Sequence, residues 1–347
     1  MVTYMIGKLL KIVEKNCTSI YYYIRKKTKK RTTRKLVLIV LSPFLLLLSL
    51  FHYIYSKTFE PIICYKKSLN SSYENNIAIA AIMKNEGLYI KEWINYHILL
   101  GITKFYLYDN ESSDDVKKIL EPYIQKGMVE YTYWPGRAKQ LDAYIDALHK
   151  GRGKSKYILF IDLDEFLVLS NPDGKLFDTI ENLYKMNDKT SAIAINWYVY
   201  GSSGYLNKPE GLVIENYKYR APNDAEPNRL VKLIANPWFI KGFYNPHSAW
   251  SVKGYYTKNE KGKIITSAEN VYPDNSYDYL RINHYYCKSQ EETKIKFARG
   301  LATDEIDIKR KWSEFERFDR NEIYDYILEP YVEKVKESMK CYEAENY

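Results

Sequence analysis

The sequence predicts an α/β domain with a mainly parallel sheet flanked by helices, preceded by a single transmembrane helix. Three observations support this prediction. Apolar runs of strand length alternate with amphipathic helical patterns over residues 76–161. An uncharged apolar stretch covers residues 36–55, and acidic or amide residues follow three of the predicted strands. Because alternating strands and helices build a parallel sheet, ligands are expected beyond the carboxyl ends of its strands.

The N-terminal region divides into a basic tail, an apolar helix and a polar stem. Residues 1–35 hold eleven lysines and arginines and a single acidic residue, Glu14. Residues 36–55 carry no Lys, Arg, Asp or Glu, and a helix of about 20 residues spans a bilayer core of roughly 30 Å. The polar residues 56–75 are expected to form the stem. The positive-inside rule then predicts a type II orientation, with residues 1–35 in the cytosol.

Two other interpretations of the apolar stretch fit less well. A cleaved signal peptide would begin closer to the N-terminus and would be followed by a small-residue cleavage site. A buried core helix would not ordinarily follow such a basic cluster.

The charge distribution argues against a nucleic-acid partner. The net charge of +9 is concentrated in the basic tail, so the remainder of the chain is close to neutral. A nucleic-acid-binding domain usually carries a basic face on its folded part. The four cysteines, Cys17, Cys64, Cys287 and Cys341, contain no closely spaced pair and give no support to a cysteine-based zinc site.

The first half of the domain, residues 76–170, shows the clearest alternation of strands and helices. The predicted strands are Asn76–Met83, Lys104–Tyr108, Met128–Trp134 and Tyr157–Ile161, and the predicted helices are Glu86–Leu100, Asp114–Lys126 and Lys139–Lys150. The absence of G-x-G-x-x-G and G-x-x-x-x-G-K-[ST] motifs argues against dinucleotide and P-loop chemistry. This half is expected to bind a nucleotide by another route.

The second half, residues 171–347, is less regular. We expect a helix over Leu176–Met186, a strand over Ser191–Tyr200, and helices over Gln290–Arg299 and Glu322–Lys340. Residues 201–285 are rich in Gly, Pro, Asn and Tyr, so they are expected to form loops and short strands that recognise an acceptor.

The segment DLDE at residues 162–165 is the most informative motif. In an extended chain Asp162 and Asp164 point to the same side, about 7 Å apart. Two such carboxylates suit a hard divalent cation, Mn²⁺ or Mg²⁺, whose remaining ligands would be water and phosphate oxygens. The alternatives are a solvated acidic turn and the nucleophile of a haloacid-dehalogenase-type phosphohydrolase. Phe166 stands where that phosphohydrolase motif normally has Thr or Val.

Four blocks of the sequence together resemble glycosyltransferase family 92 and related family 2 enzymes. They are IMKNEGLYIKEWINYHILLGITKFYLYDNESSDD (82–115), QLDAYIDAL (140–148), YILFIDLDEFL (157–167) and RINHYYCKSQEETKIKFARG (281–300). The resemblance implies a GT-A fold, a nucleotide-sugar donor, a divalent metal and transfer with inversion. It also implies galactose, moved in β linkage from a UDP-sugar to a glycan.

The resemblance assigns roles to individual residues. Donor-binding roles fall to Asn85, Glu86, Asp109, Asn110, Gln140 and Asp162, and metal binding falls to Asp162 and Asp164. Asp146 also matches the family's helix before the metal motif. Arg137 and Lys139 lie where they could face phosphates, although two solvated charges at a helix start are an equal alternative.

A third metal ligand is sought among the five histidines. His52 lies in the apolar stretch, and His97 and His149 lie on predicted helices, where structural roles are expected. His247 and His284 remain, and the sequence does not separate them.

Inverting transfer also needs a general base for the acceptor hydroxyl. Asp224 and Glu226 are the candidates, because their loop lies in the acceptor half; Asp274 and Asp278 would satisfy the same argument.

The sequence therefore predicts a metal-dependent inverting glycosyltransferase. In a eukaryote the type II orientation would place it in the Golgi, whereas in a bacterium the cytosolic donor would conflict with that orientation. The alternatives are a non-catalytic carbohydrate-binding protein on the same fold and a metal-dependent phosphohydrolase.

Overall fold

The computed structural model describes residues 26–27, 31–271, 273–299 and 310–344, and the chain forms two compact units, Met1–Lys66 and Lys67–Tyr347. The first unit contains α3 (Arg31–Ile54), the π-helical segment η1 (Tyr55–Phe59) and the start of α4 (Glu60–Asn70). The stem predicted over residues 56–75 is thus helical as far as Asn70.

The predicted transmembrane helix over residues 36–55 is wrong. This stretch is helical as part of α3, but within the residues that the structure describes no helix is long and apolar enough to cross a membrane. The helix begins at Arg31, contains Pro43 and has His52 in its last turn.

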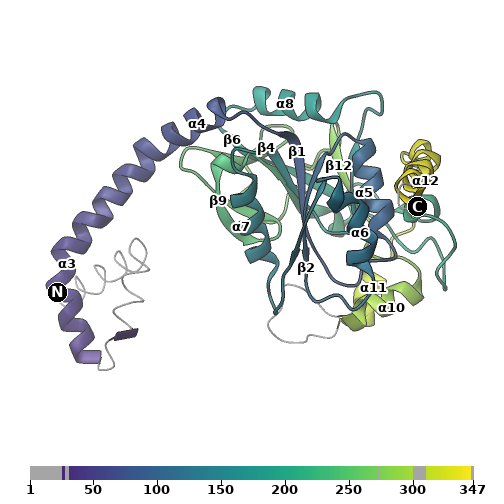
Figure 1. Cartoon of the computed structure of the whole chain (residues 1–347), viewed down its shortest axis with the longest axis horizontal. Coiled ribbons are helices and arrows are strands. Elements are labelled where there is room, and N and C mark those ends of the chain that lie inside the picture. Colours follow the sequence, from purple (N-terminus) through teal and green to yellow (C-terminus); the bar gives the residue numbers. More distant parts are fainter. Residues whose placement is uncertain (1–25, 28–30, 272, 300–309, 345–347) are drawn as a thin grey trace. The chain divides into compact units, whose positions relative to one another are not determined.

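The second unit is built on a nine-stranded mixed sheet with strand order β3-β2-β1-β4-β8-β6-β12-β5, and β11 pairs with β6 (Figure 1). Its strands are β1 (Asn75–Met83), β2 (Lys104–Asp109), β3 (Val129–Tyr133), β4 (Ser155–Phe160), β5 (Glu165–Leu169), β6 (Thr190–Val199), β8 (Val231–Ala235), β11 (Tyr256–Asn259) and β12 (Leu280–His284). The pairs β1–β2, β2–β3 and β1–β4 are parallel, whereas β8 runs antiparallel to β4 and β6. The predicted α/β class and the parallel arrangement of the first half are confirmed.

Helices cover both faces of the parallel half. On one face lie α5 (Ile90–Leu99) and α6 (Val116–Gln125), and on the other lies α7 (Gln140–Gly151) (Figure 1). Side chains of β1 alternate between them, because successive residues of a strand point to opposite faces. Ile77 and Ile79 pack with the α5 side, and Ala78 and Ala80 pack with the α7 side.

The remaining elements extend the second half of the chain. They are α8 (Leu176–Met186), α9 (Val213–Asn216), β7 (Tyr219–Arg220), η2 (Glu226–Arg229), η3 (Pro237–Phe239), β9 (Ile240–Asn245), β10 (Ser248–Ser251), α10 (Gln290–Arg299), α11 (Trp312–Phe318), β13 (Ile323–Tyr324) and α12 (Glu329–Ala344). The predicted mixture of loops and short strands over residues 201–285 is confirmed, and the last helix begins seven residues later than predicted.

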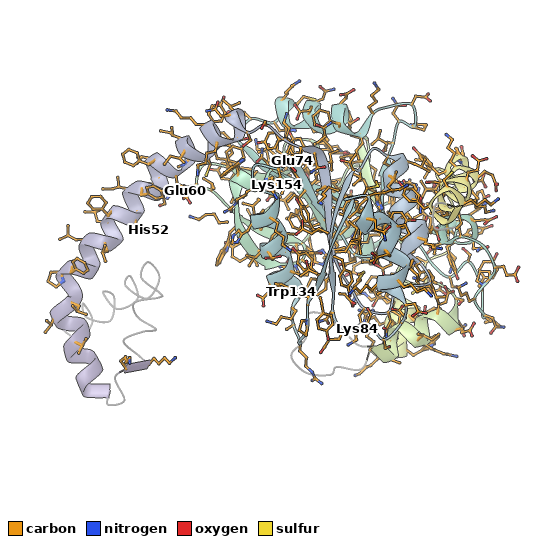
Figure 2. The ribbon with its side chains drawn as sticks, viewed as in Figure 1. His52, Glu60, Glu74, Lys84, Trp134 and Lys154 are labelled. Carbon is orange, nitrogen blue, oxygen red and sulfur yellow. The ribbon has the colours of Figure 1, made fainter. Side chains whose placement is uncertain are left out.

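The carboxyl ends of the parallel strands meet at one edge. Figure 2 marks Lys84 after β1 and Trp134 after β3 at the same end of the sheet, and Glu74 and Lys154 before β1 and β4 at the opposite end. The segment between β4 and β5 also turns at the first of these two ends.

Candidate functional site

The loops that follow β1, β2 and β3 each contain a non-glycine residue with positive φ. These residues are Asn85 (54°), Glu111 (62°) and Ala138 (52°). The left-handed conformation is costly for residues other than glycine, and such strain concentrates at functional sites. The side-chain oxygen of Asn85 accepts a hydrogen bond from the Ser113 N–H at 2.7 Å, which ties the first loop to the second.

The predicted donor-binding residues of β2 hold these loops in place. Asp109 accepts hydrogen bonds from the Ser112 N–H (2.9 Å) and from the Tyr131 hydroxyl (2.5 Å). The Asn110 amide donates to the carbonyl oxygens of Trp134 and Gly136, both at 2.8 Å. Both residues are buried, so their side chains stabilise the strand-end loops.

Asp162 lies in a turn and is held by three side chains. Oδ2 accepts a hydrogen bond from Lys232 Nζ at 2.7 Å, and Oδ1 accepts from Gln140 Nε2 at 2.8 Å and from the Tyr144 hydroxyl at 3.4 Å. Burial would raise the pKa of the Asp162 carboxyl, but Lys232 lowers it below its ordinary value. This carboxylate is therefore ionised and has partners for both of its oxygens.

Glu165, three residues further, is completely buried behind Asp162. One of its oxygens accepts a hydrogen bond from the Asp162 N–H at 3.0 Å, and Lys232 Nζ lies 3.5 Å away. Burial raises the pKa of Glu165 well above its ordinary value, although Lys232 opposes that rise. Lys232 is itself fully buried, and the negative charges of Asp162 and Glu165 raise its pKa despite burial.

Asp164 points to a different cation. Its Oδ2 lies 2.5 Å from Lys296 Nζ and 3.5 Å from His284 Nε2. Burial would raise the pKa of the Asp164 carboxyl, but Lys296 and His284 hold it well below its ordinary value. Burial lowers the pKa of both partners. A neutral imidazole thus lies beside an ionised carboxylate.

The two candidate histidines differ in their surroundings. His247 Nδ1 lies 2.8 Å from the Val231 carbonyl oxygen, and burial lowers its pKa to about 4. His284 packs against Trp197, with ring centroids 4.1 Å apart. Its Nδ1 and the Trp197 Nε1 are buried without a hydrogen-bond partner in the part of the chain that the structure describes. Of the two histidines, His284 is the one that lies next to Asp164.

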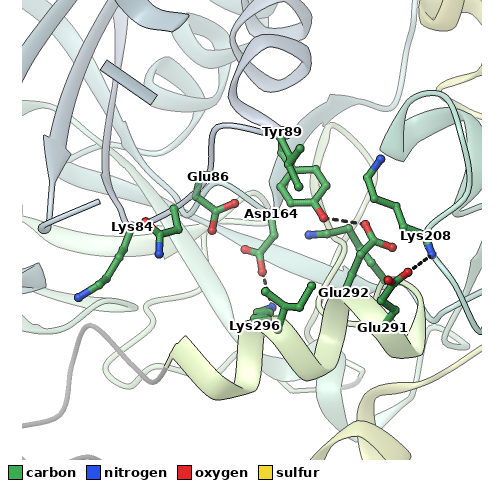
Figure 3. A pocket seen from close by; sticks show the side chains of 12 residues that line it. Lys84, Glu86, Tyr89, Asp164, Lys208, Glu291, Glu292 and Lys296 are labelled. Carbon is green, nitrogen blue, oxygen red and sulfur yellow. Dashed lines mark hydrogen bonds and ion pairs between the residues drawn. The ribbon is translucent and has the colours of Figure 1, made fainter. Parts of the chain in front are cut away.

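A cavity of about 540 Å³ opens beside Asp164 (Figure 3). Its lining comes from the loop after β1, from the β4–β5 turn, from Lys208, and from α10 together with Lys288, two residues before it. The lining residues are Lys84, Asn85, Glu86, Leu88, Tyr89, Asp164, Lys208, Lys288, Glu291, Glu292, Ile295 and Lys296. Four lysines and four carboxylates face one space, which suits a ligand with both anionic and hydroxyl groups.

The structure brings only some of the predicted site residues to this cavity. Asn85, Glu86 and Asp164 line it, and His284 adjoins it through Asp164. The other predicted residues, Asp109, Asn110, Arg137, Lys139, Gln140, Asp162, Asp224, Glu226 and His247, are not among its lining residues.

Ion pairs with neighbouring residues explain why Lys139 and Glu226 do not line the cavity. Lys139 pairs with Asp142 at 2.8 Å, and Glu226 pairs with both Arg229 and Arg317. These groups are engaged in exposed ion pairs away from the cavity.

Sequence reasoning missed the contribution of α10 and of Lys288, two residues before it. Lys288, Glu292 and Lys296 are spaced four residues apart, which is the spacing of one helical face. That spacing was available in the segment KSQEETKIK, but only His284 was selected from its block.

Comparison with known proteins assigns the family. The family model of glycosyltransferase family 92 matches residues 79–339, which include the cavity and the β4–β5 turn. The chain belongs to glycosyltransferase family 92.

Other members of family 92 are similar over much of this chain. A family 92 protein from Ricinus communis is 27% identical over 67% of this chain and 39% of its own length. A family 92 protein from Oryza sativa is 24% identical over 80% of this chain and 47% of its own length. A β-1,4-galactosyltransferase from Caenorhabditis elegans is 32% identical over 33% of this chain and 29% of its own length. The chain thus spans less than half the length of these relatives.

Solved structures match this family 92 chain only in part. TarS from S. aureus, in complex with UDP, aligns with a TM-score of 0.30 and 15% identity over 47% of each chain. A glucosyl-3-phosphoglycerate synthase from Mycobacterium tuberculosis, solved with Mn²⁺ and UDP, aligns with a TM-score of 0.25 and 15% identity over 39% of this chain and 47% of that chain.

Whether the site can hold a divalent cation depends on Asp164 and His284. Within the described residues no three His, Cys, Asp or Glu side chains form a metal-binding group. Asp162 has its own partners, but Asp164 and the neutral His284 are close enough to share one ion. The Lys296 ammonium already places a positive charge against Asp164. Two protein ligands supplemented by water and phosphate oxygens fit a hard divalent cation.

Proposed function

We propose that this family 92 chain transfers a sugar from a nucleotide-sugar donor to a glycan acceptor, in the cavity beside Asp164. One observation carries the proposal: an ionised carboxylate and several lysines line one cavity beyond the carboxyl ends of β1 and β4, and a neutral imidazole lies beside that carboxylate. Such an arrangement suits a ligand that carries a diphosphate and leaves as an anion. The family assignment supports glycosyl transfer as the reaction.

We propose a UDP-sugar as the donor and galactose, moved in β linkage, as the sugar. The relative from Caenorhabditis elegans, named a β-1,4-galactosyltransferase, supports this choice over 126 matched residues.

A divalent cation, Mn²⁺ or Mg²⁺, would be held by Asp164 and His284 and would offset negative charge on the leaving diphosphate. In this proposal Asp162 is a positioning residue. Its contacts with Lys232 and Gln140 fix the turn that presents Asp164 to the cavity.

We propose Glu86 as a candidate general base beside the two predicted from sequence. Glu86 is buried, lines the cavity and faces the Asp164 side of it (Figure 3). Glu226 pairs with two arginines, and its ion pair and hydrogen bond with Arg317 lower its pKa, which weakens it as a base. Asp224 is exposed and lies outside the cavity lining.

The phosphohydrolase alternative is less well supported. It requires an aspartate oxygen that can attack phosphorus, and both oxygens of Asp162 accept hydrogen bonds from neighbouring side chains. Detection of a covalent aspartyl phosphate would support the phosphohydrolase alternative instead.

The test is a screen of the full chain against UDP-galactose, UDP-glucose and UDP-N-acetylglucosamine, with and without Mn²⁺ and oligosaccharide acceptors. We expect UDP release that depends on the acceptor, together with a glycosylated product seen by mass spectrometry. Asp164→Asn should reduce product formation by roughly 100-fold or more, because the amide neither pairs with Lys296 nor holds a cation.

The matched control is Asp173→Asn, an exposed aspartate in the loop after β5, which should leave the rate within about twofold, since surface substitutions have small effects. The proposal is wrong if the wild-type chain consumes no nucleotide sugar, or if Asp164→Asn transfers sugar undiminished.

A further inference from the structure

Lys288, two residues before α10, is a buried cation that faces the cavity. Its side chain is 7% exposed, and its Nζ lies 4.2 Å from the centre of the Tyr89 ring. The residue is part of the cavity lining. No hydrogen bond or ion pair joins its ammonium to another residue in the described part of the chain.

The other buried lysines near the site are paired. Lys232 contacts Asp162 at 2.7 Å, and Lys296 contacts Asp164 at 2.5 Å. The Lys288 Nζ is not among the fully buried polar atoms that lack a partner, so its ammonium opens onto the cavity, where the face of the Tyr89 ring contacts it. Lys288 differs from Lys232 and Lys296 in making no hydrogen bond or ion pair within the described residues, although it interacts at longer range with Glu92, Asp164 and Glu292.

One carboxylate that lines the same cavity, Glu292, is already engaged. Glu292 accepts hydrogen bonds from the Tyr89 hydroxyl (2.7 Å), the Tyr217 hydroxyl, and the hydroxyl and N–H of Ser289 (2.5 and 3.1 Å). Lys288 influences the pKa of Glu292 without reaching ion-pair distance. These contacts hold the carboxylate in place, so it does not move to neutralise Lys288.

The geometry points to Lys288 as the residue that binds the oxyanion of the ligand in this cavity, the diphosphate of the nucleotide sugar. This inference rests on the proposed function. Lys288 and Lys296 line the same space as Asp164, so an anion placed there would complete the pairing that Lys288 lacks. A ligand oxyanion could also belong to an acidic acceptor, and the experiment below separates these sources.

The test compares the binding of UDP and of uridine to the full chain by isothermal titration calorimetry. Lys288→Met keeps the length and apolar stem of the side chain but removes the charge. We expect it to weaken UDP binding about tenfold or more, the value of one charge-assisted hydrogen bond, and to leave uridine binding unchanged. Lys288→Arg keeps the charge and should retain most of the affinity for UDP.

The matched control is Lys294→Met, since Lys294 is an exposed lysine of α10 outside the cavity lining; it should change UDP affinity by less than about threefold. Circular dichroism and thermal melting establish that each variant is folded, and Lys288→Arg carries the comparison if Lys288→Met is not folded. In that case the inference requires that Lys288→Arg bind UDP more tightly than uridine, with the same ratio of affinities as the wild type.

Three outcomes overturn the inference. The first is unchanged UDP binding in Lys288→Met, and the second is an equal loss of UDP and uridine affinity in that variant. Unchanged UDP binding with a raised KM for an acidic acceptor would assign the oxyanion to the acceptor. These results leave the proposed function standing, whereas failure of the wild-type chain to bind any nucleoside diphosphate removes both.

Discussion

The ammonium of Lys232 and the carboxylate of Asp162 form an ion pair of 2.7 Å that joins β8 to the turn after β4. Lys232 is fully buried, and it also lies 3.5 Å from the buried Glu165. Lys232 thus compensates the charge of Asp162 and lies beside Glu165, whose pKa burial raises well above its ordinary value. The third acidic residue, Asp164, is left to face the cavity with Lys296.

Removing this lysine should destabilise the fold. Lys232→Met leaves Asp162 without its counter-ion, and because the Asp162 side chain is 35% exposed the cost is at most the roughly 3–5 kcal/mol of a fully buried pair. The free energy of unfolding from urea titration measures the effect. Lys185→Met, at an exposed position of α8, should stay within about 0.5 kcal/mol of the wild type. A loss of less than about 1 kcal/mol in Lys232→Met would contradict the role of this pair.

The two candidate histidines should differ in their effect on cation binding. His284→Ala removes the imidazole beside Asp164 and should weaken Mn²⁺ binding about tenfold or more. His247→Ala should have a smaller effect, because His247 contacts the Val231 carbonyl oxygen. Electron paramagnetic resonance of free Mn²⁺, measured with the full chain and UDP, gives both dissociation constants. Equal and unchanged values in the two variants would remove histidine from the proposed metal site.

Stability should fall in acid partly because of His97. Its Nδ1 lies 2.8 Å from the Trp93 carbonyl oxygen, and its Nε2 accepts a hydrogen bond from the Leu167 N–H at 3.3 Å. Burial lowers its pKa from 6.5 to about 3 in the folded chain, so the unfolded chain takes up the proton first. The contribution of His97 is fully present above pH 6.5 and is lost as pH falls from there toward 3.

The measurement is the free energy of unfolding at pH 7 and pH 5 for the wild type and His97→Gln. Glutamine does not titrate, so the variant should lose less stability between the two pH values. The expected difference is on the order of 1–2 kcal/mol, since one pKa unit corresponds to about 1.4 kcal/mol. Identical pH dependence in both proteins would show that His97 does not contribute.

Three variants, each of which replaces one candidate carboxylate by the corresponding amide, test which residue is the general base. Glu86→Gln should reduce kcat by roughly 100-fold with little change in the KM for the donor, because general bases contribute about 10²–10⁴-fold. Glu226→Gln and Asp224→Asn should change kcat by less than about threefold, since both residues lie outside the cavity lining. The reverse order of effects would restore the candidates chosen from sequence.

Local patterns in the sequence were sufficient to predict much of the fold. Alternating apolar runs located β1, β2, β3 and β4 and the helices between them, because strand and helix periodicity is set by neighbouring residues. His97 was expected to be structural, and its two hydrogen bonds confirm that. The predicted transmembrane helix was wrong, since no helix within the described residues is long and apolar enough to cross a membrane.

The site depended on contacts between distant parts of the chain. Sequence reasoning located the DLDE turn. It could not show that Lys232, 70 residues away, pairs with Asp162, or that Lys296, 132 residues away, pairs with Asp164. The sequence by itself determined the strand order along the chain and the chemistry available at the strand ends. Only the tertiary structure decided which charge meets which, because ion pairing depends on distance and burial in three dimensions, and neither can be read from sequence spacing.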